Sequence, residues 1–397
     1  MTPDSRIGSP VKRSRSGSDA APATRGRPTR GRVLRRVIAA ASALLTIAAL
    51  SACTNAVSPG GAQHHTDANP SHAAIGLLLP DSTNTRYEAE DRPFFVAEIA
   101  KLCPGCTVKY QNASADASKQ QAQAEAMLSQ GISVLVLDAV DGEAAVSIVN
   151  AAIAQNVPVI AYDRLVDSPN LSYYVSFDNR KVGVLQGQAL VDKLKADGVP
   201  RGSGILMVNG SPTDNNAILY KKGAHSVIDT SGYTVLAQYD TPDWAGSEAQ
   251  TWVAGQITQF GSTIAGIYAA NDSLAQGAIT AMQAAGVSPI PPTTGQDAEL
   301  AGVQRILAGT QYMTVYKPMK QEAEKTAQLA INLVNGKHPR GESTVKTGGG
   351  VVQSFELSPI AVTAQNMEST VIAGGFHTAR QVCTPTYERY CKKYGIK

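Results

Sequence analysis

The sequence predicts an α/β protein made of two doubly wound lobes, and two observations carry this prediction. Short runs rich in Val, Ile and Leu alternate with longer amphipathic stretches from residue 74 onward, and this alternation starts again near residue 204. Continuous apolar strands separated by helices are typical of parallel sheets that are covered on both faces. With 397 residues, of which 43% are hydrophobic, the chain is long enough for two such lobes.

The elements of each lobe can be placed from this alternation. In the first lobe we expect strands at 74–79, 107–111, 134–137, 157–162 and 173–176, with helices at 116–130 and 143–155. For the second lobe we expect strands at 204–208, 234–238 and 264–269, with helices at 182–195, 246–258 and 274–285. No G-x-G-x-x-G motif follows the first strand and the sequence has no Walker phosphate loop, which argues against a dinucleotide or P-loop site.

The segment that ends at Cys53 has the features of a secretion signal. Arginines cluster before residue 37, and an uncharged run rich in Ala, Leu and Ile follows at 37–50. That run is about 14 residues long, shorter than the ~20 residues that span a bilayer. It ends Leu50-Ser51-Ala52-Cys53, which resembles the lipobox of bacterial lipoproteins. We therefore expect residues 1–53 to be a lipoprotein signal peptide with the lipid on Cys53; a plain signal peptide that contains a cysteine is the alternative.

Residues 54–73 are small, polar and rich in Pro and Gly, so we expect a flexible tether that cannot bury enough apolar surface to fold. His64, His65 and His72 lie in it. A metal site is the alternative, but a solvated linker gives the imidazoles no fixed geometry. We expect no metal.

Four cysteines follow Cys53, and an even number outside the cytoplasm suggests two disulfides. We expect the local pairs Cys103–Cys106 and Cys383–Cys391. The first pair also has the C-x-x-C spacing of redox motifs, but it lies in a turn between a helical stretch and a strand. A structural bridge is the preferred interpretation, and redox chemistry is the alternative.

Polar side chains follow nearly every predicted strand. Ligands of such sheets bind beyond the carboxyl ends of the strands, where these side chains would gather. The stretches are 80–86, Asp138, Asp163-Arg164, 211–216, Asn271-Asp272 and Gln296-Asp297. Asp, Asn and Arg supply paired donors and acceptors that match the neighbouring hydroxyls of a sugar. A single Asp at a strand end could merely cap the next helix, but six such stretches in register favour a binding site.

At these residues the sequence resembles the type I periplasmic sugar-binding proteins of ABC importers, and among them the D-xylose-binding receptors. The stretches that carry the resemblance are AYDR from Ala161, SFDNRKVGVLQGQALVD from Ser176, GSPTDNNA from Gly210, AANDSLAQGAITA from Ala269 and GQDAELAGVQRILAGTQYMTVYKP from Gly295. The resemblance runs from about residue 75 to residue 378. It implies two Rossmann-like lobes joined by a multi-strand hinge, a monosaccharide held between them, and no catalysis or cofactor.

The resemblance also implies which residues contact the sugar. In the first lobe they are Arg86, Asp163 and Arg164. Asp138 is a fourth, at a position where ribose-type relatives use Asn. In the second lobe they are Asn215, Asn216, Asn271 and Asp297, with Trp244 on the face of the pyranose and Lys317 near the hinge. Core packing is the alternative for Trp244, and a solvated surface charge is the alternative for Lys317. We expect the adjacent Asp163 and Arg164 to be partners.

The first loop departs from the xylose receptors. It has one residue more between Arg86 and Asp91, and Tyr87 stands in place of a tryptophan. Because this loop encloses one edge of the sugar, the departure bears on which sugar is bound.

The resemblance divides the chain after the tether into two lobes. The N-terminal lobe is expected at 74–178 plus about 318–350, and the C-terminal lobe at 179–317 plus about 351–397. We expect a monomer that is anchored at the extracytoplasmic face of the cell membrane and presents its sugar to ABC permease subunits.

Three rival interpretations follow from the same residues. A sugar-responsive repressor of this fold needs a helix-turn-helix where this chain has the lipobox and tether, and the chain beyond its basic leader is slightly acidic, which argues against nucleic-acid binding. A glycosidase would use Asp163 and Asp297, but neighbouring Arg and Lys would keep both ionised, without a general acid. A receptor for glucose, galactose, arabinose, ribose or a signalling sugar is the mildest alternative.

Overall fold

A computed structural model of the chain describes residues 70–397, which belong to one compact unit. The predicted signal peptide, Cys53 and the tether up to residue 69 lie outside the described residues. None of the helices within 70–397 combines the length and the apolar character that crossing a membrane requires.

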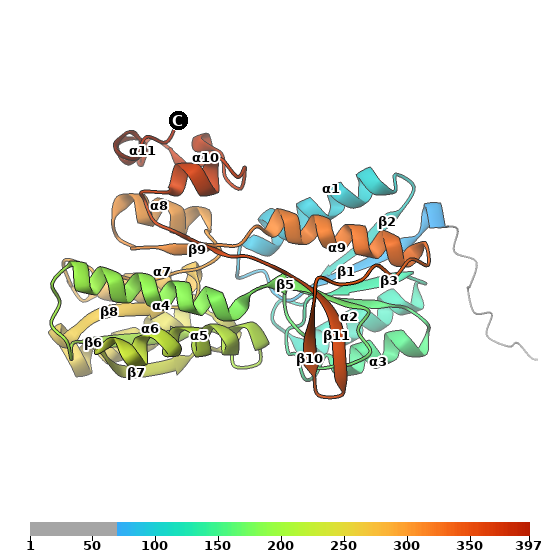
Figure 1. Cartoon of the computed structure of the whole chain (residues 1–397), viewed down its shortest axis with the longest axis horizontal. Helices are drawn as coiled ribbons and strands as arrows, with labels where there is room; N and C mark the ends of the chain where they lie inside the picture. The colour runs from blue at the N-terminus through green and yellow to red at the C-terminus, as the bar shows by residue number, and fades with distance from the viewer. Residues whose placement is uncertain (1–69) are drawn as a thin grey trace, which may run out of the picture. The chain divides into compact units, whose positions relative to one another are not determined.

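The first lobe is built on a seven-stranded sheet with the order β10-β11-β5-β4-β3-β1-β2 (Figure 1). The strands are β1 (Ala74–Leu79), β2 (Thr107–Asn112), β3 (Val134–Leu137), β4 (Val159–Tyr162), β5 (Tyr173–Phe177), β10 (Ser343–Thr347) and β11 (Gly350–Leu357). Neighbouring strands from β2 to β11 pair in parallel, and β10 pairs antiparallel at the edge. β1, β3, β4 and β5 are buried almost throughout, as expected for strands with helices on both faces.

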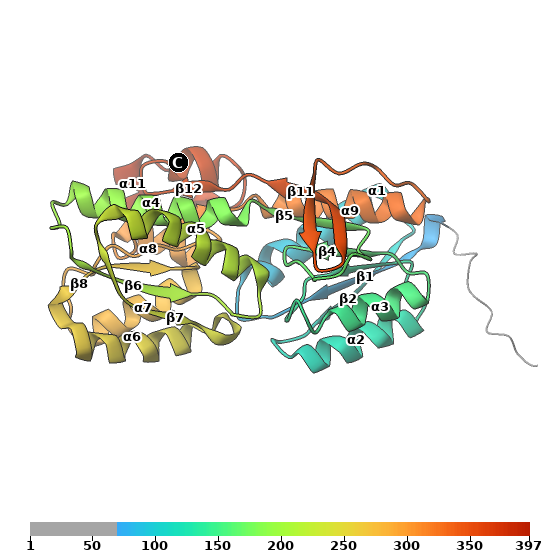
Figure 2. The same cartoon turned by 60° about the horizontal axis from the view of Figure 1, so that its bottom comes forward.

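Helices cover both faces of this sheet (Figure 2). Helix α1 (Arg92–Leu102) packs on α9 (Met319–Val334), and α2 (Ala117–Ser129) packs on α3 (Val146–Ala154) on the opposite face. Asp116 caps α2 by accepting a hydrogen bond from the backbone N–H of Lys119 at 3.0 Å. The predicted strands and helices of this lobe are present, and their ends agree to within three residues.

The second lobe has a three-stranded parallel sheet with the order β7-β6-β8. Its strands are β6 (Gly204–Asn209), β7 (Thr234–Asp240) and β8 (Ile264–Ala269), beside a separate antiparallel pair of β9 (Thr314–Tyr316) and β12 (Ile360–Val362). Its helices are α4 (Asn179–Ala196), α5 (Asn215–Ser231), α6 (Gly246–Phe260), α7 (Asp272–Ala284) and α8 (Leu300–Ala308). Helix α4 packs on α5 and α6 packs on α7, each pair on one face of the sheet (Figure 2).

Helices α4 and α5 approach each other closely because glycines face the neighbouring backbone. A Cβ atom at Gly183 would lie 1.9 Å from the carbonyl oxygen of Tyr220, and one at Gly223 would lie 2.2 Å from that of Arg180. Any larger residue at these two positions would push α5 outward. The contact therefore fixes the side of α5 that carries Asn216 and Tyr220.

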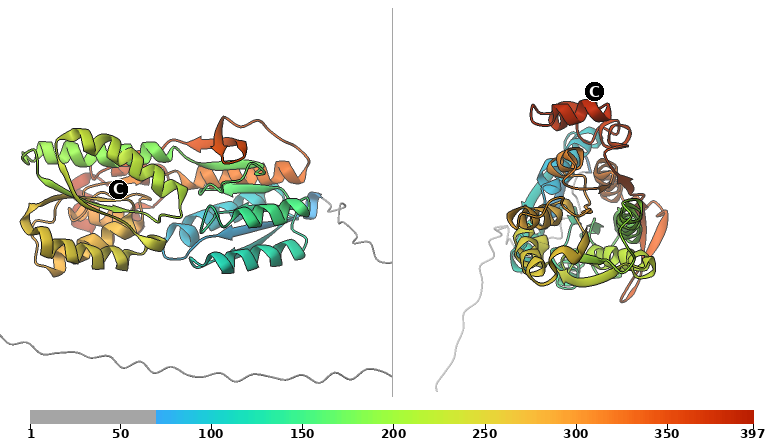
Figure 3. Two further views of the ribbon diagram at one scale, coloured as in Figure 1. Left: turned by 90° about the horizontal axis from the view of Figure 1, so that it is seen from below. Right: turned by 90° about the vertical axis from the view of Figure 1, so that its left-hand side faces the viewer.

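The chain passes between the lobes at three places within the described residues, and these places form the hinge. It crosses from β5 to α4, from β9 to α9 through Lys317, and from β11 to β12. Figure 3 shows the two lobes from below and end-on. The expected return to the second lobe at about residue 351 is wrong by several residues, because residues 354–357 of β11 still pair with β5 in the first sheet.

The ends of the described part are held against the lobes. Pro70–His72 form a 3-10 turn, Ala73 is buried, and its carbonyl oxygen accepts a hydrogen bond from Thr107 at 2.9 Å. Residues 70–73 therefore belong to the first lobe and not to the tether. The structure contains both disulfides, Cys103–Cys106 and Cys383–Cys391, and the second joins α10 (Ala379–Val382) and α11 (Glu388–Tyr394) on the second lobe.

Candidate functional site

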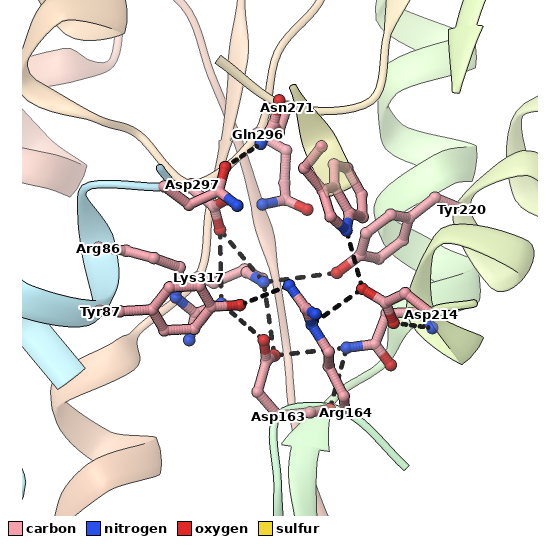
Figure 4. A pocket seen from close by; sticks show the side chains of 13 residues that line it. Arg86, Tyr87, Asp163, Arg164, Asp214, Tyr220, Asn271, Gln296, Asp297 and Lys317 are labelled. Atoms are coloured by element: carbon pink, nitrogen blue, oxygen red, sulfur yellow. Dashed lines mark hydrogen bonds and ion pairs between the residues drawn. The ribbon is translucent and has the colours of Figure 1, made fainter. Parts of the chain in front are cut away.

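A cavity lies between the lobes, at the carboxyl ends of β1, β4, β6 and β8 (Figure 4). Its lining side chains lie close together and leave a free volume of only about 20 Å³, little more than one water molecule needs. A ligand can therefore enter only if the lobes move apart. The lining residues are Asn84, Arg86, Tyr87, Asp163, Arg164, Asp214, Asn216, Tyr220, Trp244, Asn271, Gln296, Asp297 and Lys317.

Arg86 lies at the start of the π-helix η2 (Tyr87–Asp91) and is held by carboxylates on several sides. Its Nε and Nη2 atoms donate to the two carboxylate oxygens of Asp91, both at 2.8 Å. Nη2 also donates to Glu322 at 3.2 Å, and Nη1 donates to Asp163 at 3.0 Å. Burial lowers the pKa of Arg86, but these carboxylates outweigh it and raise the pKa well above its ordinary value. The guanidinium is therefore charged and fixed before any ligand arrives.

Arg164 has a different set of partners from the one that the sequence predicts. Its Nη2 atom donates to the hydroxyl of Tyr87 at 3.0 Å and to Asp81 at 3.3 Å. Its Nε atom lies 3.1 Å from a carboxylate oxygen of Asp214 in the second lobe. The expected pairing of Asp163 with Arg164 is therefore wrong, because successive side chains after β4 point to different sides and Asp163 turns toward Arg86.

Asp163 and Asp297 face each other across two cations. Lys317 lies with its Nζ atom 3.2 Å from Asp297 and 3.6 Å from Asp163, and Arg86 lies 3.6 Å from Asp297. Burial raises the pKa of Asp163, but Arg86 and Lys317 outweigh burial and hold it below the ordinary value. Lys317 is buried, which excludes the alternative that it is a solvated surface charge.

Both aspartates sit on unusual backbone. Asp163 has φ of 53° and Asp297 has φ of 86°, in the left-handed region that costs non-glycine residues energy. The backbone N–H of each donates to the next strand at 2.9 Å, Asp163 to Val175 and Asp297 to Val315. The two lobes thus present their carboxylates through the same local geometry.

The second lobe contributes polar side chains from the first turns of its helices. Asn271 caps α7 by accepting from Leu274 N at 2.8 Å, and its amide donates to Asn84 of the first lobe at 2.8 Å. Asp214 caps α5 by accepting from Asn216 N at 2.8 Å. Asn216 donates to the carbonyl oxygen of Asp163 at 2.9 Å. The helix-capping and binding interpretations of these residues are therefore compatible, since one side chain performs the two roles with different atoms.

Trp244 both lines the cavity and belongs to the core of the second lobe. Its indole N–H donates to Asp214 at 3.1 Å, and its ring centroid lies 6.2 Å from that of Tyr220. The ring lies against Gly210, where an added Cβ would come within 2.1 Å of it. Gly210 is therefore required for the position of the indole.

Two of the ten expected contact residues do not line the cavity. Asn215 is half-exposed at the first position of α5, because the next residue, Asn216, occupies the side of the helix that faces inward. Asp138 is fully buried behind Arg164, with its carboxylate 3.6 Å from Nε. Asp138 therefore supports Arg164 and does not face the cavity.

Five lining residues were absent from the expected set. Asp214 and Gln296 belong to stretches that the strand-end argument singled out, and Tyr87 was noted only as a departure. Tyr220 lies four residues after Asn216 on α5, so helical spacing could have identified it. Asn84 belongs to the stretch 80–86, which the strand-end argument also singled out.

Burial raises the pKa of two acids near the cavity, Asp138 and Glu322. Burial raises the pKa of Asp138 well above its usual value, and the nearby Arg164 opposes this only in part. Burial and the Asp163 charge raise the pKa of Glu322 well above its usual value, against the effect of Arg86. The prediction that neighbouring Arg and Lys side chains keep Asp163 ionised agrees with the lowered pKa of this residue. No group of three or more His, Cys, Asp or Glu residues suited to a metal occurs in the described part of the chain.

The comparisons with known proteins agree with this geometry. Residues 75–338 match the family described as "Periplasmic binding protein domain". The D-xylose-binding periplasmic protein of Escherichia coli K12 is 36% identical over 332 residues, which are 83% of this chain and 96% of that protein. The protein of the same name from Haemophilus influenzae is 38% identical over 314 residues, 78% of this chain and 91% of that protein.

A solved structure of an ABC transporter solute-binding protein from Clostridium phytofermentans, with bound β-D-glucose, superposes with a TM-score of 0.70. It is 28% identical and covers 78% of this chain and 99% of its own. These relatives are binding proteins and not enzymes, which confirms the prediction that the chain catalyses no reaction. The family match, the relatives and the two lobes around a polar cavity show that this chain belongs to the periplasmic binding proteins and has their type I fold.

Proposed function

We propose that this protein is the receptor of a carbohydrate ABC importer and that it binds one monosaccharide, D-xylose before others, in the cavity between the lobes. Two relatives that are 36% and 38% identical are named for D-xylose binding. The cavity contributes the observation that carries the proposal. Charged and amide side chains from both lobes converge on one small space between the lobes.

The lining suits a polyhydroxylated ring. Each hydroxyl of a sugar donates one hydrogen bond and accepts others, so it needs both carboxylate or carbonyl oxygens and N–H donors nearby. Asp163 and Asp297 supply acceptors, and Arg86, Lys317 and Asn271 supply donors. A sugar with one hydroxyl in the wrong orientation would leave buried groups unpaired, which is how such a site rejects it.

Closure of the lobes completes the site. Arg164 in the first lobe lies 3.1 Å from Asp214 in the second, and Asn84 accepts a hydrogen bond from Asn271 across the same gap. A ligand that contacts both lobes binds the closed arrangement more tightly than the open one, and it shifts the population accordingly. The closed receptor is then the form that the permease recognises.

Another aldose is the second candidate. The related structure from Clostridium phytofermentans holds β-D-glucose. The first loop carries Tyr87, whose hydroxyl accepts from Arg164, at the edge where the xylose receptors differ from this chain. A sugar-sensing role would use the same site with a different partner.

Calorimetric titration of the purified protein with D-xylose, D-glucose, D-galactose, L-arabinose and D-ribose tests the proposal. We expect 1:1 binding, tightest for D-xylose, and a stabilisation of roughly 2.7 kcal/mol at about 100 times the dissociation constant. If another aldose binds most tightly, D-xylose is not the preferred ligand, but the proposal that the protein is a sugar receptor stands. Failure of all five sugars to bind would refute the sugar assignment.

The lipid anchor on Cys53 is a separate proposal, supported by the arginine cluster, the short apolar run and Leu50-Ser51-Ala52-Cys53. Replacing Cys53 with Ser should leave the precursor unprocessed or release the protein from the membrane. Fractionation and intact-mass measurement check this. A variant that stays in the membrane at the wild-type mass would contradict the anchor.

A further inference from the structure

Asp272 is a buried carboxylate of the second lobe that does not line the ligand cavity. It is the first residue of α7, next to Asn271, and none of its surface is exposed. Its side chain lies against the loop that carries Gln296 and Asp297, both of which line the cavity (Figure 4). A Cβ atom at Gly295 would lie 2.0 Å from the carboxylate of Asp272, so only glycine allows the loop to come this close.

The backbone of this loop is strained at two successive residues. Asp297 and Ala298 have φ of 86° and 51°, in the left-handed region that is unfavourable for non-glycine residues. Such conformations persist only where the surrounding structure holds them. The loop therefore needs contacts with other elements to keep the Asp297 carboxylate near Lys317 and Arg86.

Asp272 binds the loop on both sides of the strained pair. Its backbone N–H donates to the carbonyl oxygen of Gln296 at 3.0 Å, and its Oδ2 atom accepts from the backbone N–H of Glu299 at 2.9 Å. Oδ2 also accepts from the hydroxyl of Thr314 at 3.0 Å, and this hydroxyl accepts from the backbone N–H of Ala298 at 3.1 Å. Three backbone groups of the loop are therefore tied to Asp272, directly or through Thr314.

Asp272 is itself held by two buried polar side chains. Gln311 donates from Nε2 to Oδ1 of Asp272 at 2.6 Å. Arg305 donates from Nη2 to the carbonyl oxygen of Asp272 at 2.7 Å and from Nε to Oε1 of Gln311 at 3.0 Å. Arg305 belongs to α8 and Gln311 to the turn before β9, so the carboxylate cannot rotate without breaking contacts to both.

We propose that Asp272 is a positioning residue for sugar binding, because it holds the loop in the conformation that presents the Asp297 carboxylate to the ligand. The inference rests on the proposed function. Since Asp272 does not line the cavity, it acts on the ligand only through the loop. Its neighbour Asn271 faces the cavity directly, so the two adjacent residues have different roles.

Asp272→Asn tests the inference at nearly constant size. An amide has one oxygen, so on one side an NH2 group would face the former donors Gln311 or Glu299. Calorimetry with whichever of the five aldoses binds most tightly should show an affinity at least about tenfold weaker, still with 1:1 stoichiometry. A purely structural role would instead lower the melting temperature and leave the affinity of the folded protein unchanged.

Leu194→Ala is the matched control for lost stability. Leu194 is fully buried in the core of the same lobe, near the end of α4 that is farther from the cavity. The variant should lower the melting temperature, because it leaves a hole in the core, but change the affinity by less than about twofold. A loss of affinity as large as that of Asp272→Asn would show that destabilisation of the lobe alone weakens binding, and it would overturn the inference.

A double-mutant cycle asks whether Asp272 acts through Asp297. Asp297→Gly removes the positioned carboxylate and is compatible with φ of 86°. It should weaken binding by at least about tenfold, and adding Asp272→Asn should then weaken it by less than about threefold more. An undiminished loss in the Asp297→Gly background, or a loss below about threefold in the wild-type background, would overturn the inference.

Hydrogen exchange of the sugar-free protein tests the loop without a ligand. In Asp272→Asn the backbone N–H groups of Ala298 and Glu299 should exchange at least about tenfold faster than in the wild type. If this variant does not fold, Thr314→Val removes the bridging hydroxyl at nearly the same size and should accelerate the exchange of Ala298. Unchanged exchange would show that Asp272 does not hold the loop. Failure of every aldose to bind the wild type would refute the proposed function, and the exchange rates would still decide whether Asp272 holds the loop.

Discussion

The two lobes hold their halves of the site by different means. In the first lobe, arginines are fixed by ion pairs between residues that are far apart in sequence. Arg86 contacts Asp91, Asp163 and Glu322, the last of them 236 residues away. Arg164 contacts Asp81 from the first loop. These side chains are buried, so their charges are paired within the lobe before a ligand enters.

In the second lobe, the polar side chains are fixed mainly by their own helices. Asn271 and Asp214 cap α7 and α5, and each uses a remaining atom toward the first lobe. A cap needs only a partner two or three residues away. The position of these side chains is therefore determined locally.

This difference has a consequence for mutation. Removing one member of a buried ion network leaves other charges without partners, whereas removing a cap leaves one neutral backbone N–H without its partner. We therefore expect changes in the first lobe to affect affinity and stability together. Changes at the helix caps of the second lobe should separate the effect on affinity from the effect on stability.

The largest effect is expected for Arg164→Ala. The change removes the donors to Tyr87 and Asp81 and the ion pair with Asp214 across the lobes. Affinity for the bound sugar should fall by at least about a hundredfold, since buried charge-assisted hydrogen bonds are worth roughly 1.5–3 kcal/mol each. The melting temperature should fall as well. Arg164→Lys keeps the positive charge but loses the planar guanidinium with its paired donors, so its affinity should be only partly restored relative to Arg164→Ala. A change below threefold by calorimetry would show that Arg164 is not part of the site.

A smaller effect is expected for Asp297→Asn. This carboxylate of the second lobe lies 3.2 Å from Lys317 and 3.6 Å from Arg86, and the variant keeps the shape but loses the charge. Affinity should fall about ten- to thirtyfold, and the melting temperature should fall as well, because Lys317 and Arg86 lose a buried carboxylate partner. Asp240→Asn is the control, because Asp240 pairs with Lys221 at the exposed surface, where an ion pair is worth little. Equal losses for both variants would contradict the role of Asp297.

A pair of variants at Asn271 separates capping from binding. Asn271→Ser keeps an oxygen that can cap α7 but loses the amide that donates to Asn84. It should weaken sugar binding about five- to tenfold and preserve the melting temperature. Asn271→Ala should weaken binding equally and also cost roughly 1 kcal/mol of stability. Urea unfolding and calorimetry measure the two quantities. If both variants lose the same stability, the hydroxyl does not replace the cap.

The smallest effect concerns a buried acid behind the second-lobe half of the site. Burial, with the charges of Asp272 and Asp297, raises the pKa of Glu299 from 4.5 to about 8. The folded protein thus keeps a proton that the unfolded chain releases above 4.5. The stability that this proton contributes is complete below 4.5 and is lost as the pH rises through 8.

Glu299→Gln cannot titrate, so its free energy of unfolding should fall less between about pH 5 and pH 8.5 than that of the wild type. The difference should be at least about 1 kcal/mol, because one pKa unit corresponds to about 1.4 kcal/mol. Urea unfolding at the two pH values measures it. Parallel pH dependences in the two proteins would show that Glu299 is ionised in the folded state at neutral pH.

Much of the fold was predictable because its pattern is local. The apolar runs that became β1, β3 and β8 end where the sequence pattern ends, and parallel strands bring their carboxyl ends to one edge. That rule brought Asp163, Asn216 and Asp297 to the cavity. It could not exclude Asn215, because one residue along a helix turns a side chain by about 100°.

The two-lobed α/β architecture, the strand ends and most of the polar residues at the cleft could be predicted from the sequence, since each depends on periodicity or on the residue that follows a strand. The contacts that these polar residues make could be found only in the folded chain. Arg164 pairs with Asp81 and Asp214 and not with its neighbour Asp163. Asp138 lies buried behind Arg164 and contacts its guanidinium instead of facing the cavity. These contacts join residues tens to hundreds of positions apart, and their geometry depends on how the lobes fold and close, which no short stretch of sequence encodes.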